Sequence, residues 1–441
     1  MVRFQAPRGT RDLLPAQAAV LYRLFDLARE LGGRYGYRPI EIPLFEEAAV
    51  FERAIGSATD VVEKELFRIT GAGGGAGGGE GSGDAARWAL RPEATAGVVR
   101  AYVQHGMQTL PQPVRLASFG PMFRYDRPQA GRYRQFWQWN VEAIGDPGPA
   151  VDAEIIELGL RFLRGAGAAG VEVHLNSIGD AACRPAYVAT LVAYLRGVED
   201  RLPALARARL ATNPLRVLDS KDPQLAPILA DAPRMADHLC AACAEHFAGL
   251  REHLARLAVP VRDAPHIVRG LDYYTRTAFE YFVPGAQGQQ SALGGGGRYD
   301  GLVELLGGRP TPGVGFALGI DRVLAIAEEV APAATSAPVA VVVGADPAAT
   351  AVRLEIATNL RAAGVAAAAD LAPRKLGRQL EGAAREGAHF AVVVGDELAG
   401  GQVQLRDLQA GTQRLVNVAD LARELERAQA SHRHGEGSPG A

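Results

Sequence analysis

Four arginines lie in one short segment of the 441-residue chain: Arg124, Arg127, Arg132 and Arg134. The proline and glycine between them predict the loop of a long hairpin. A guanidinium group binds phosphate oxygens in pairs and neutralises charge that develops on a reacting phosphorus. The segment therefore indicates phosphate chemistry, although a solvated basic loop is the alternative interpretation of the same pattern.

A further arginine, Arg322, falls in the first turn of an expected helix, behind a turn that contains Gly313, Gly315 and Gly319. A helix N-terminus attracts anions through its unpaired N–H groups and its dipole. The alternative is an ordinary exposed arginine. The stretch 71–84 has the glycine content of a phosphate loop but lacks the Gly-Lys-Ser/Thr ending. We interpret it as a flexible surface loop.

A second group of residues has the chemistry to bind an ammonium group or an imidazole. Glu93 is followed closely by Thr95, and Gln138 and Glu142 stand four apart on an expected strand. This even spacing places the last two side chains on one face of a sheet. A carboxylate, an amide and a hydroxyl would then face one ligand.

Arg269 precedes a glycine and the pair Tyr273 and Tyr274. The glycine allows close approach of a ligand or another backbone. The tyrosines offer flat surfaces and hydroxyl groups to an aromatic or hydrogen-bonding ligand. The alternative is that one tyrosine packs in the core and the other is exposed.

The only three cysteines are Cys183, Cys240 and Cys243. Cys240, Cys243 and His246 fall on one face of an expected helix, with His238 nearby, which is a weak zinc pattern because structural zinc prefers four ligands. Small buried cysteines are the alternative, and we expect no metal held by the protein alone. Three cysteines form no disulfide framework, so a reducing cytoplasm is expected.

The bulk properties describe a globular protein. The hydrophobic fraction is 48% and the net charge is −2, so any contact with RNA must come from local basic patches. No run approaches the ~20 apolar residues of a membrane span, and the N-terminus lacks the pattern of a signal peptide.

The chain divides by pattern into four parts. Residues 1–330 hold the first domain, with a helical insertion over about 180–255; 331–338 are a linker by composition, and 428–441 a disordered polar tail. Strands and helices alternate over 339–427, which predicts an α/β domain with a largely parallel sheet.

Within the first domain, an apolar stripe predicts a helix over 16–35, and 37–44 alternate like an edge strand. Two strands flank the arginine hairpin between 114 and 144. Further strands are expected within 267–282 and at 313–317, with a helix over about 319–330. A glycine cluster lies within 292–306.

Together, these segments resemble the signature regions of the class II aminoacyl-tRNA synthetases, and in particular of the histidyl-tRNA synthetase family. The resemblance runs in order from about residue 3 to 427. It is carried by the opening segment 7–15, by 123–136 and 313–322, which are similar to motifs 2 and 3, and by 268–274 and 294–301, which are similar to the two histidine-specific signatures.

The resemblance implies an α+β catalytic domain, in which helices flank an antiparallel sheet, and a C-terminal anticodon-binding domain. It implies a histidine–tRNA ligase that uses ATP and Mg²⁺ to activate L-histidine and transfers it to tRNA-His. Arg124 and Arg269 would act on the α-phosphate as catalytic residues, and Arg322 would hold the γ-phosphate. The histidine-binding residues would be Glu93, Thr95, Gln138, Glu142, Tyr273, Tyr274 and Tyr299, and the candidates for the tRNA acceptor end Arg127, Gln129 and Arg134.

The chain departs from the family pattern at Ala94, Tyr125 and Trp137, and Ala94 makes the backbone beside Glu93 less certain. Two rival interpretations remain: a non-catalytic regulatory paralogue of an ATP phosphoribosyltransferase, and another class II synthetase. The histidine-specific signatures and the C-terminal domain argue against both. Members of this class commonly form homodimers through the segment matched here by 37–55, where Pro39, Ile42, Leu44 and Phe45 are the candidate contacts.

Overall fold

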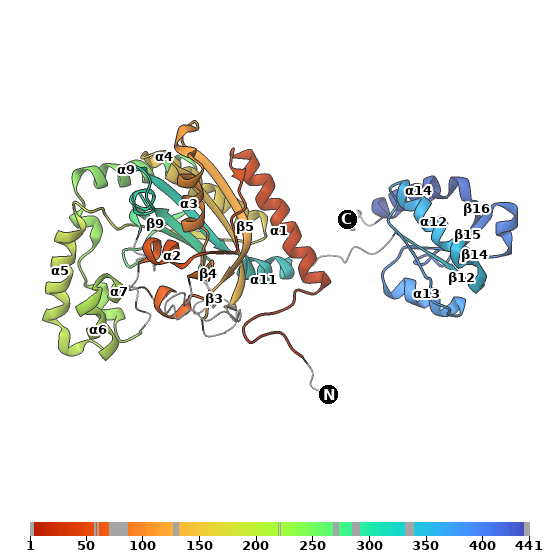
Figure 1. Cartoon of the computed structure of the whole chain (residues 1–441), viewed down its shortest axis with the longest axis horizontal. Coiled ribbons are helices and arrows are strands. Elements are labelled where there is room, and N and C mark those ends of the chain that lie inside the picture. Colours follow the sequence, from red (N-terminus) through yellow and green to blue (C-terminus); the bar gives the residue numbers. More distant parts are fainter. Residues whose placement is uncertain are drawn as a thin grey trace, which may run out of the picture. The chain divides into compact units, whose positions relative to one another are not determined.

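The computed structural model describes residues 4–56, 59, 61–69, 87–126, 132–218, 220, 222–267, 273–284, 292–330 and 339–435. They form two compact units, Met1–Ala333 and Ala334–Ala441, which are drawn in Figure 1. Within the described part of the chain, no helix combines the length and the apolar character needed to span a membrane.

The first unit is built on an eight-stranded sheet with the strand order β1-β5-β6-β11-β10-β9-β7-β8. Only the two edge pairs, β1 with β5 and β7 with β8, are parallel. The bounds are Arg38–Pro39 for β1, Val114–Phe123 for β5, Gln135–Ile144 for β6, Glu172–Ser177 for β7, Val261–Asp263 for β8, Thr275–Phe282 for β9, Ala292–Arg298 for β10 and Gly313–Gly319 for β11.

Helices cover both faces of this sheet (Figure 1). One face packs against α1 (Pro15–Arg34), α4 (Pro149–Gly165), α9 (Ala241–Arg256) and α11 (Ile320–Val330) in a large apolar core. The opposite face packs against α2 (Ala48–Ile55), α3 (Thr95–Gln104) and α10 (Leu302–Leu305) in a second core. A small sheet of β2 (Phe45–Glu47), β4 (Trp88–Leu90) and β3 (Arg68–Ile69) lies beside α2.

The expected helical insertion is present and has an apolar core of its own. It contains α5 (Arg184–Gly197), α6 (Ala204–Thr212), α7 (Leu215–Leu218) and α8 (Ala226–Ala230), and the chain returns to the sheet through α9. Single helical turns elsewhere are η1 (Val61–Glu65), η2 (Met107–Thr109), η3 (Glu199–Arg201), η4 (Met235–His238), η6 (Pro347–Ala349), η7 (Asp396–Gly400) and η8 (Val418–Asp420).

The second unit has the strand order β13-β12-β14-β15-β16. Its elements are β12 (Ala340–Gly344), α12 (Thr350–Ala362), β13 (Ala367–Ala369), α13 (Leu376–Arg385), β14 (Phe390–Val394), β15 (Gln402–Asp407), β16 (Gln413–Asn417) and α14 (Leu421–Gly435). The helices α12 and α14 pack on one face of this sheet, and α13 packs on the other.

The structure confirms the predicted edge strand, the hairpin strands and the first helix, and it corrects two predictions. The sheet of the second unit is only half parallel, because β15 and β16 run antiparallel to their neighbours. The expected disordered tail is helical as far as Gly435. The glycine cluster is a buried strand, β10, and the short strand β8 was not predicted at all. The expected loop 71–84 and linker 331–338 lie outside the described residues.

Candidate active site

Strand β6 carries a row of polar side chains on one face. Gln138, Asn140 and Glu142 alternate with Trp139, Val141 and Ala143, which belong to the core on the other face. The period of two confirms the predicted common face of Gln138 and Glu142. All three polar side chains are buried, so this face forms the floor of a shielded polar site.

The carboxylate of Glu142 lies at the centre of this site. It accepts hydrogen bonds from Thr95 Oγ1 at 2.7 Å and from the hydroxyl of Tyr299 at 2.6 Å. Burial raises the pKa of Glu142 to about 8, although both hydrogen bonds act in the opposite direction. A strongly shifted carboxyl group among convergent hydroxyls is typical of a ligand-binding site.

Three buried tyrosines surround Glu142. The ring of Tyr273 lies 4.7 Å from that of Tyr274 and 6.0 Å from that of Tyr299, measured between centroids. Burial raises the pKa of Tyr273 and of Tyr299 well above the ordinary value, and nearby Glu142 adds to both shifts. Their hydroxyls therefore stay protonated, and that of Tyr299 donates its proton to Glu142.

Glycine on the neighbouring strands makes room for these groups. Gly315 stands opposite Glu142 across the β11–β6 pair, and a Cβ atom there would lie 1.8 Å from Glu142 Oε2. A Cβ atom on Gly297 would lie 2.9 Å from Cδ1 of Tyr274. The glycines of these two strands thus allow the backbone to pass directly beside the polar site.

The amide side chains of this face have unmet hydrogen-bonding capacity. Gln138 Oε1 and both amide atoms of Asn140 are buried, without a hydrogen-bond partner among the described residues. Such groups cost about 1–3 kcal/mol each when nothing pairs with them, so they indicate a bound polar ligand. Asn140 was missed in the sequence, although its position in the same alternation was the signal that could have found it.

Glu93 lies at the N-terminus of α3. Its carboxylate accepts hydrogen bonds from the backbone N–H groups of Thr95 at 2.7 Å and Ala96 at 2.9 Å. Burial raises its pKa, whereas these N–H groups and the charge of Arg124 lower it. Alanine at position 94, where the chain departs from the family pattern, therefore does not prevent the backbone N–H groups of Thr95 and Ala96 from binding Glu93.

Arg124 follows strand β5 and lies close to Glu93. Its Nε donates to the carbonyl of Pro92 at 2.9 Å, and its guanidinium group lies 5.5 Å from the ring centroid of Phe136. These contacts hold the guanidinium group beside the polar face of β6. Arg269 and the rest of 268–272 lie outside the described residues.

Arg322 lies at the start of α11 and donates a hydrogen bond to the carbonyl of Ala292. Burial lowers its pKa, the charge of Arg132 lowers it further, and Glu280 raises it. Arg132 itself pairs with Asp126 at 3.0 Å. Guanidinium groups near the start of α11 are suited to bind an anion. The hairpin pattern predicted phosphate chemistry for Arg132 together with its neighbours but assigned it no specific phosphate group.

The hairpin is joined to the N-terminal segment. Arg134 packs over the ring of Tyr125, 3.8 Å from its centroid, and its Nη1 donates to the carbonyl of Arg8 at 3.4 Å. Arg11 forms an ion pair with Asp321 at 2.8 Å, and Asp321 also accepts from the backbone N–H of Trp137. Arg127 and Gln129 lie outside the described residues.

A buried ionic network lies beside Tyr299. Its neighbour Arg298 is fully buried and pairs with Asp152 at 2.7 Å, and it also donates to Nε2 of His246 at 3.1 Å. Thr277 donates to the same carboxylate. His246 therefore does not join the cysteines, which corrects that part of the zinc pattern, because its Nε2 is held by Arg298.

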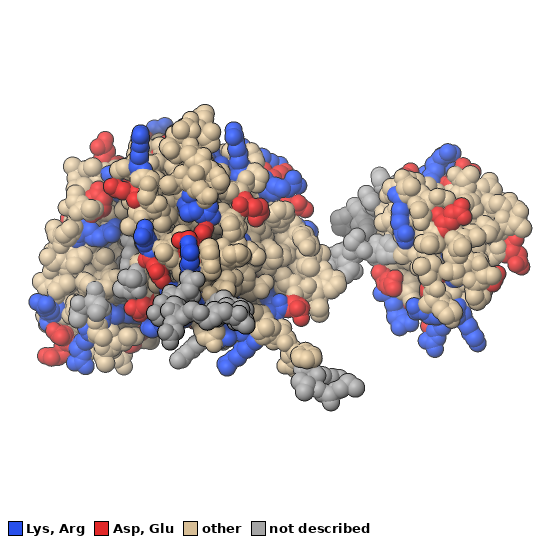
Figure 2. Space-filling model, in the orientation of Figure 1, with Lys and Arg blue, Asp and Glu red and all other residues tan. Residues whose placement is uncertain are grey.

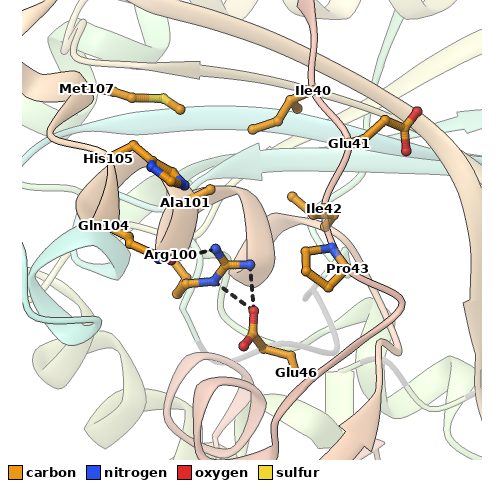
Figure 3. Close-up of a pocket in the computed structure, with 10 residues that line it drawn as sticks. All are labelled: Ile40, Glu41, Ile42, Pro43, Glu46, Arg100, Ala101, Gln104, His105 and Met107. Carbon is orange, nitrogen blue, oxygen red and sulfur yellow. Dashed lines mark hydrogen bonds and ion pairs between the residues drawn. The ribbon is translucent and has the colours of Figure 1, made fainter.

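A surface hollow of about 500 Å³ lies elsewhere, between α3 and the chain that follows β1. Figure 3 shows Ile40, Ile42 and Pro43 on one side and Ala101 and His105 on the other. Arg100 and Glu46 form an ion pair at 2.6 Å along its rim. None of the predicted histidine- or ATP-binding residues lines this hollow.

Comparison with known proteins gives two family matches. Residues 9–323 match the family model described as histidyl-tRNA synthetase, and residues 337–428 match that described as anticodon binding domain. The chain is 45% identical over 427 residues to the histidine–tRNA ligase of Desulforudis audaxviator, an alignment that covers 96% of this chain and 98% of the relative. It is 44% identical to the histidine–tRNA ligase of Moorella thermoacetica, over 95% of this chain and 98% of that one.

Among solved structures, the chain is similar to the apo histidyl-tRNA synthetase of S. aureus. The TM-score is 0.78 and the identity is 32%, with 96% of this chain and 100% of the other covered. A Bacillus halodurans structure described as an ATP phosphoribosyltransferase regulatory subunit/histidyl-tRNA synthetase matches with a TM-score of 0.59 at 22% identity, over 84% of this chain and 93% of the other. At that identity the likeness shows a shared fold alone.

Proposed function

We propose roles for individual residues from the premise that this chain belongs to the histidyl-tRNA synthetase family. The chain is a histidine–tRNA ligase: it activates L-histidine with ATP and transfers it to tRNA. The observation that carries the residue assignments is the buried carboxylate of Glu142, held by two hydroxyl groups on the floor of a polar site.

We assign the imidazole ring of histidine to Glu142, Tyr274 and Tyr299, with Tyr273 packed against them. The α-amino group would be bound by Glu93, Thr95 and Gln138. Unpaired Gln138 Oε1 supports this assignment, because a ligand N–H donor would satisfy it. A different amino acid would leave buried polar groups unpaired, and sites of this kind discriminate by about 10⁴-fold or more.

The carboxylate of histidine attacks the α-phosphorus of ATP, and pyrophosphate leaves. We assign Arg124 to the α-phosphate, with Arg269 on the opposite side, and Arg322 to the γ-phosphate. Arg132 would share that terminal phosphate, since its charge acts directly on Arg322. Phosphoryl transfer depends mainly on positioning and charge neutralisation, which guanidinium groups supply.

Mg²⁺ fits the residues beside Arg322. Glu280 on β9 lies near enough to raise the pKa of Arg322, and Mg²⁺ binds through one or two carboxylates together with substrate phosphates. The ion would neutralise phosphate charge there. Glu280 would hold the ion next to the phosphates that Arg322 and Arg132 bind.

Transfer to tRNA-His uses both units in this proposal. Arg127, Gln129 and Arg134 would approach the acceptor end, and the second unit would bind the anticodon. Arg374 and Lys375 are exposed at the start of α13, and Figure 2 shows basic side chains projecting on that side of the unit. Buried Gln379 positions this segment, because its Nε2 donates to the carbonyl of Arg374 at 2.7 Å.

Removal of residues 339–441 should therefore reduce tRNA charging far more than histidine-dependent pyrophosphate exchange. The double variant Arg374→Ala/Lys375→Ala should do the same in the full chain, by about ten-fold in charging, because each lost phosphate contact weakens binding to RNA. Charging and exchange rates measured on one preparation test this. Equal losses in both activities would refute the division of labour.

We also propose a homodimer formed through residues 37–55. Leu44 and Phe45 are exposed although they are large and apolar, at 45% and 52%, and the hollow of Figure 3 lies beside them. A second copy would cover this surface. Phe45→Glu should therefore give a monomer in sedimentation equilibrium. A wild-type chain that sediments as a monomer would rule the dimer out.

We place the enzyme in the cytoplasm, where three free thiols remain reduced. The decisive test of function is ATP–pyrophosphate exchange measured with each of the twenty amino acids separately. Exchange with histidine alone is expected. Exchange with another amino acid would overturn the roles of Glu142 and Tyr274, and folded protein without any exchange would favour the regulatory paralogue.

A further inference from the structure

All three cysteines of the chain converge on one carboxylate at the junction between the sheet and the helical insertion. Asp180 and Cys183 lie in the turn between β7 and α5, and Cys240 and Cys243 lie at the start of α9. One donor atom from each of the four residues lies within 4.8 Å of all the others. Sixty residues separate Asp180 from Cys240, so folding alone brings these groups together.

The spacing of the donors suits a tetrahedral zinc ion. A Zn–S bond of ~2.3 Å places sulfur ligands about 3.8 Å apart, and zinc accepts Cys and Asp together in four-coordinate sites. Cys183 Sγ already lies 3.6 Å from Asp180 Oδ1, and Cys240 Sγ lies 3.9 Å from it. Rearrangement by about an ångström would bring all four donors onto one ion.

The surroundings also suit a bound cation with soft ligands. Cys183 and Cys243 are buried in the core of the insertion, whereas Cys240 and Asp180 are half-buried, which leaves an entry path. Thiolate-rich sites select zinc over magnesium or calcium. Nη2 of Arg276 lies 3.6 Å from Asp180 Oδ2 and would balance the excess negative charge of three thiolates and a carboxylate.

We propose that Asp180, Cys183, Cys240 and Cys243 bind one structural zinc ion. The pattern in the sequence contained only two of these ligands, since it paired Cys240 and Cys243 with histidines instead. His246 contacts Arg298, and His238 packs against Tyr187 at 5.7 Å between ring centroids.

The zinc ion would fix the start of the helical insertion next to Tyr274, one of the residues that we assign to histidine. In the turn that Asp180 closes, Gly179 accepts from the backbone N–H of Arg276 at 2.7 Å, at the start of β9. Arg184, next to Cys183, donates to the carbonyl of Tyr274 at 2.6 Å. A metal at Asp180 and Cys183 would therefore hold the turn that positions Tyr274.

The test is the metal content of the full chain, purified under reducing conditions without chelators. We expect about one zinc per chain by mass spectrometry of the metals. Replacement by Co²⁺ should produce sulfur-to-cobalt charge-transfer absorption and the strong visible bands of tetrahedral coordination. The three thiols should react with a thiol reagent slowly until a chelator is added, and quickly afterwards.

Cys240→Ser is the most informative variant, because Cys240 is the N-cap of α9 and serine is a favourable N-cap. It should lose at least 90% of the zinc while the helical circular dichroism is retained. Asp180→Asn should weaken zinc binding, and Asp237→Asn and His238→Ala, which alter neighbours outside the cluster, should leave the metal content unchanged.

Wild-type protein that binds neither zinc nor cobalt while its three thiols react freely would overturn the proposal. A disulfide between two of the three cysteines, found by mass spectrometry of the protein purified in this way, would also overturn it. Zinc that persists in both Cys240→Ser and Asp180→Asn would place the metal elsewhere.

Discussion

Arg124→Ala is expected to lower histidine-dependent ATP–pyrophosphate exchange by about 10³-fold, the effect typical of removing a guanidinium group that stabilises a phosphoryl-transfer transition state. Arg124 is held beside the polar face of β6 by the carbonyl of Pro92 and the ring of Phe136. The loss should fall on the turnover number, since the charge on the reacting phosphorus grows in the transition state. Steady-state exchange rates, measured while the concentrations of ATP and histidine are varied in turn, give the turnover number and the Michaelis constants.

Two further variants separate the role of Arg124 from nonspecific effects. Arg124→Lys keeps the charge but loses the planar pair of donors, so it should recover only part of the activity. Arg256→Ala removes an exposed arginine of α9 that pairs with Glu252, and it should exchange at the wild-type rate. Near-normal turnover in Arg124→Ala, with the fold intact, would remove Arg124 from the reaction.

Glu142→Gln is expected to raise the Michaelis constant for histidine by roughly 30-fold, which corresponds to about 2 kcal/mol, the typical cost of leaving a buried hydrogen-bonding group without its partner. The Michaelis constant for ATP should change little, because the arginines that we assign to the phosphates are unaltered. Glu355→Gln, at an exposed carboxylate of α12, is the matched control and should leave both constants unchanged. An equal rise for histidine and ATP would count against an imidazole-binding role.

The same variant has a pH-dependent effect on stability. Burial raises the pKa of Glu142 from 4.5 to about 8, so between these values the folded protein holds a proton that the unfolded chain has lost. The free energy of unfolding of the wild type therefore falls as pH rises through this window. Relative to wild type, Glu142→Gln should gain stability there, by at most about 1.4 kcal/mol per pH unit.

Urea denaturation without histidine, at several pH values, measures this difference. It should grow between pH 4.5 and about 8 and then level off. A difference that stays constant across the window would mean that Glu142 ionises near its ordinary pKa.

Local patterns in the sequence were sufficient for most of the elements. The alternation on both sides of the arginine hairpin predicted β5 and β6, and an apolar stripe predicted α1, because both patterns depend only on near neighbours. Glycine patterns gave no prediction of the strand β10. They usually mark turns, and the close approach of Tyr274 and β11 that requires glycine there is a tertiary feature.

The signature segments also determined the family, since their order along the chain is a property of the sequence, and the period of two along β6 by itself places Gln138 and Glu142 on one face. Only the tertiary structure decided which groups meet across elements. It placed Asn140 on the binding face and Arg132 near enough to Arg322 to lower its pKa. It also placed His246 in contact with Arg298, and Asp180 beside the three cysteines. These contacts depend on strand register and helix packing between distant segments, which no local pattern encodes.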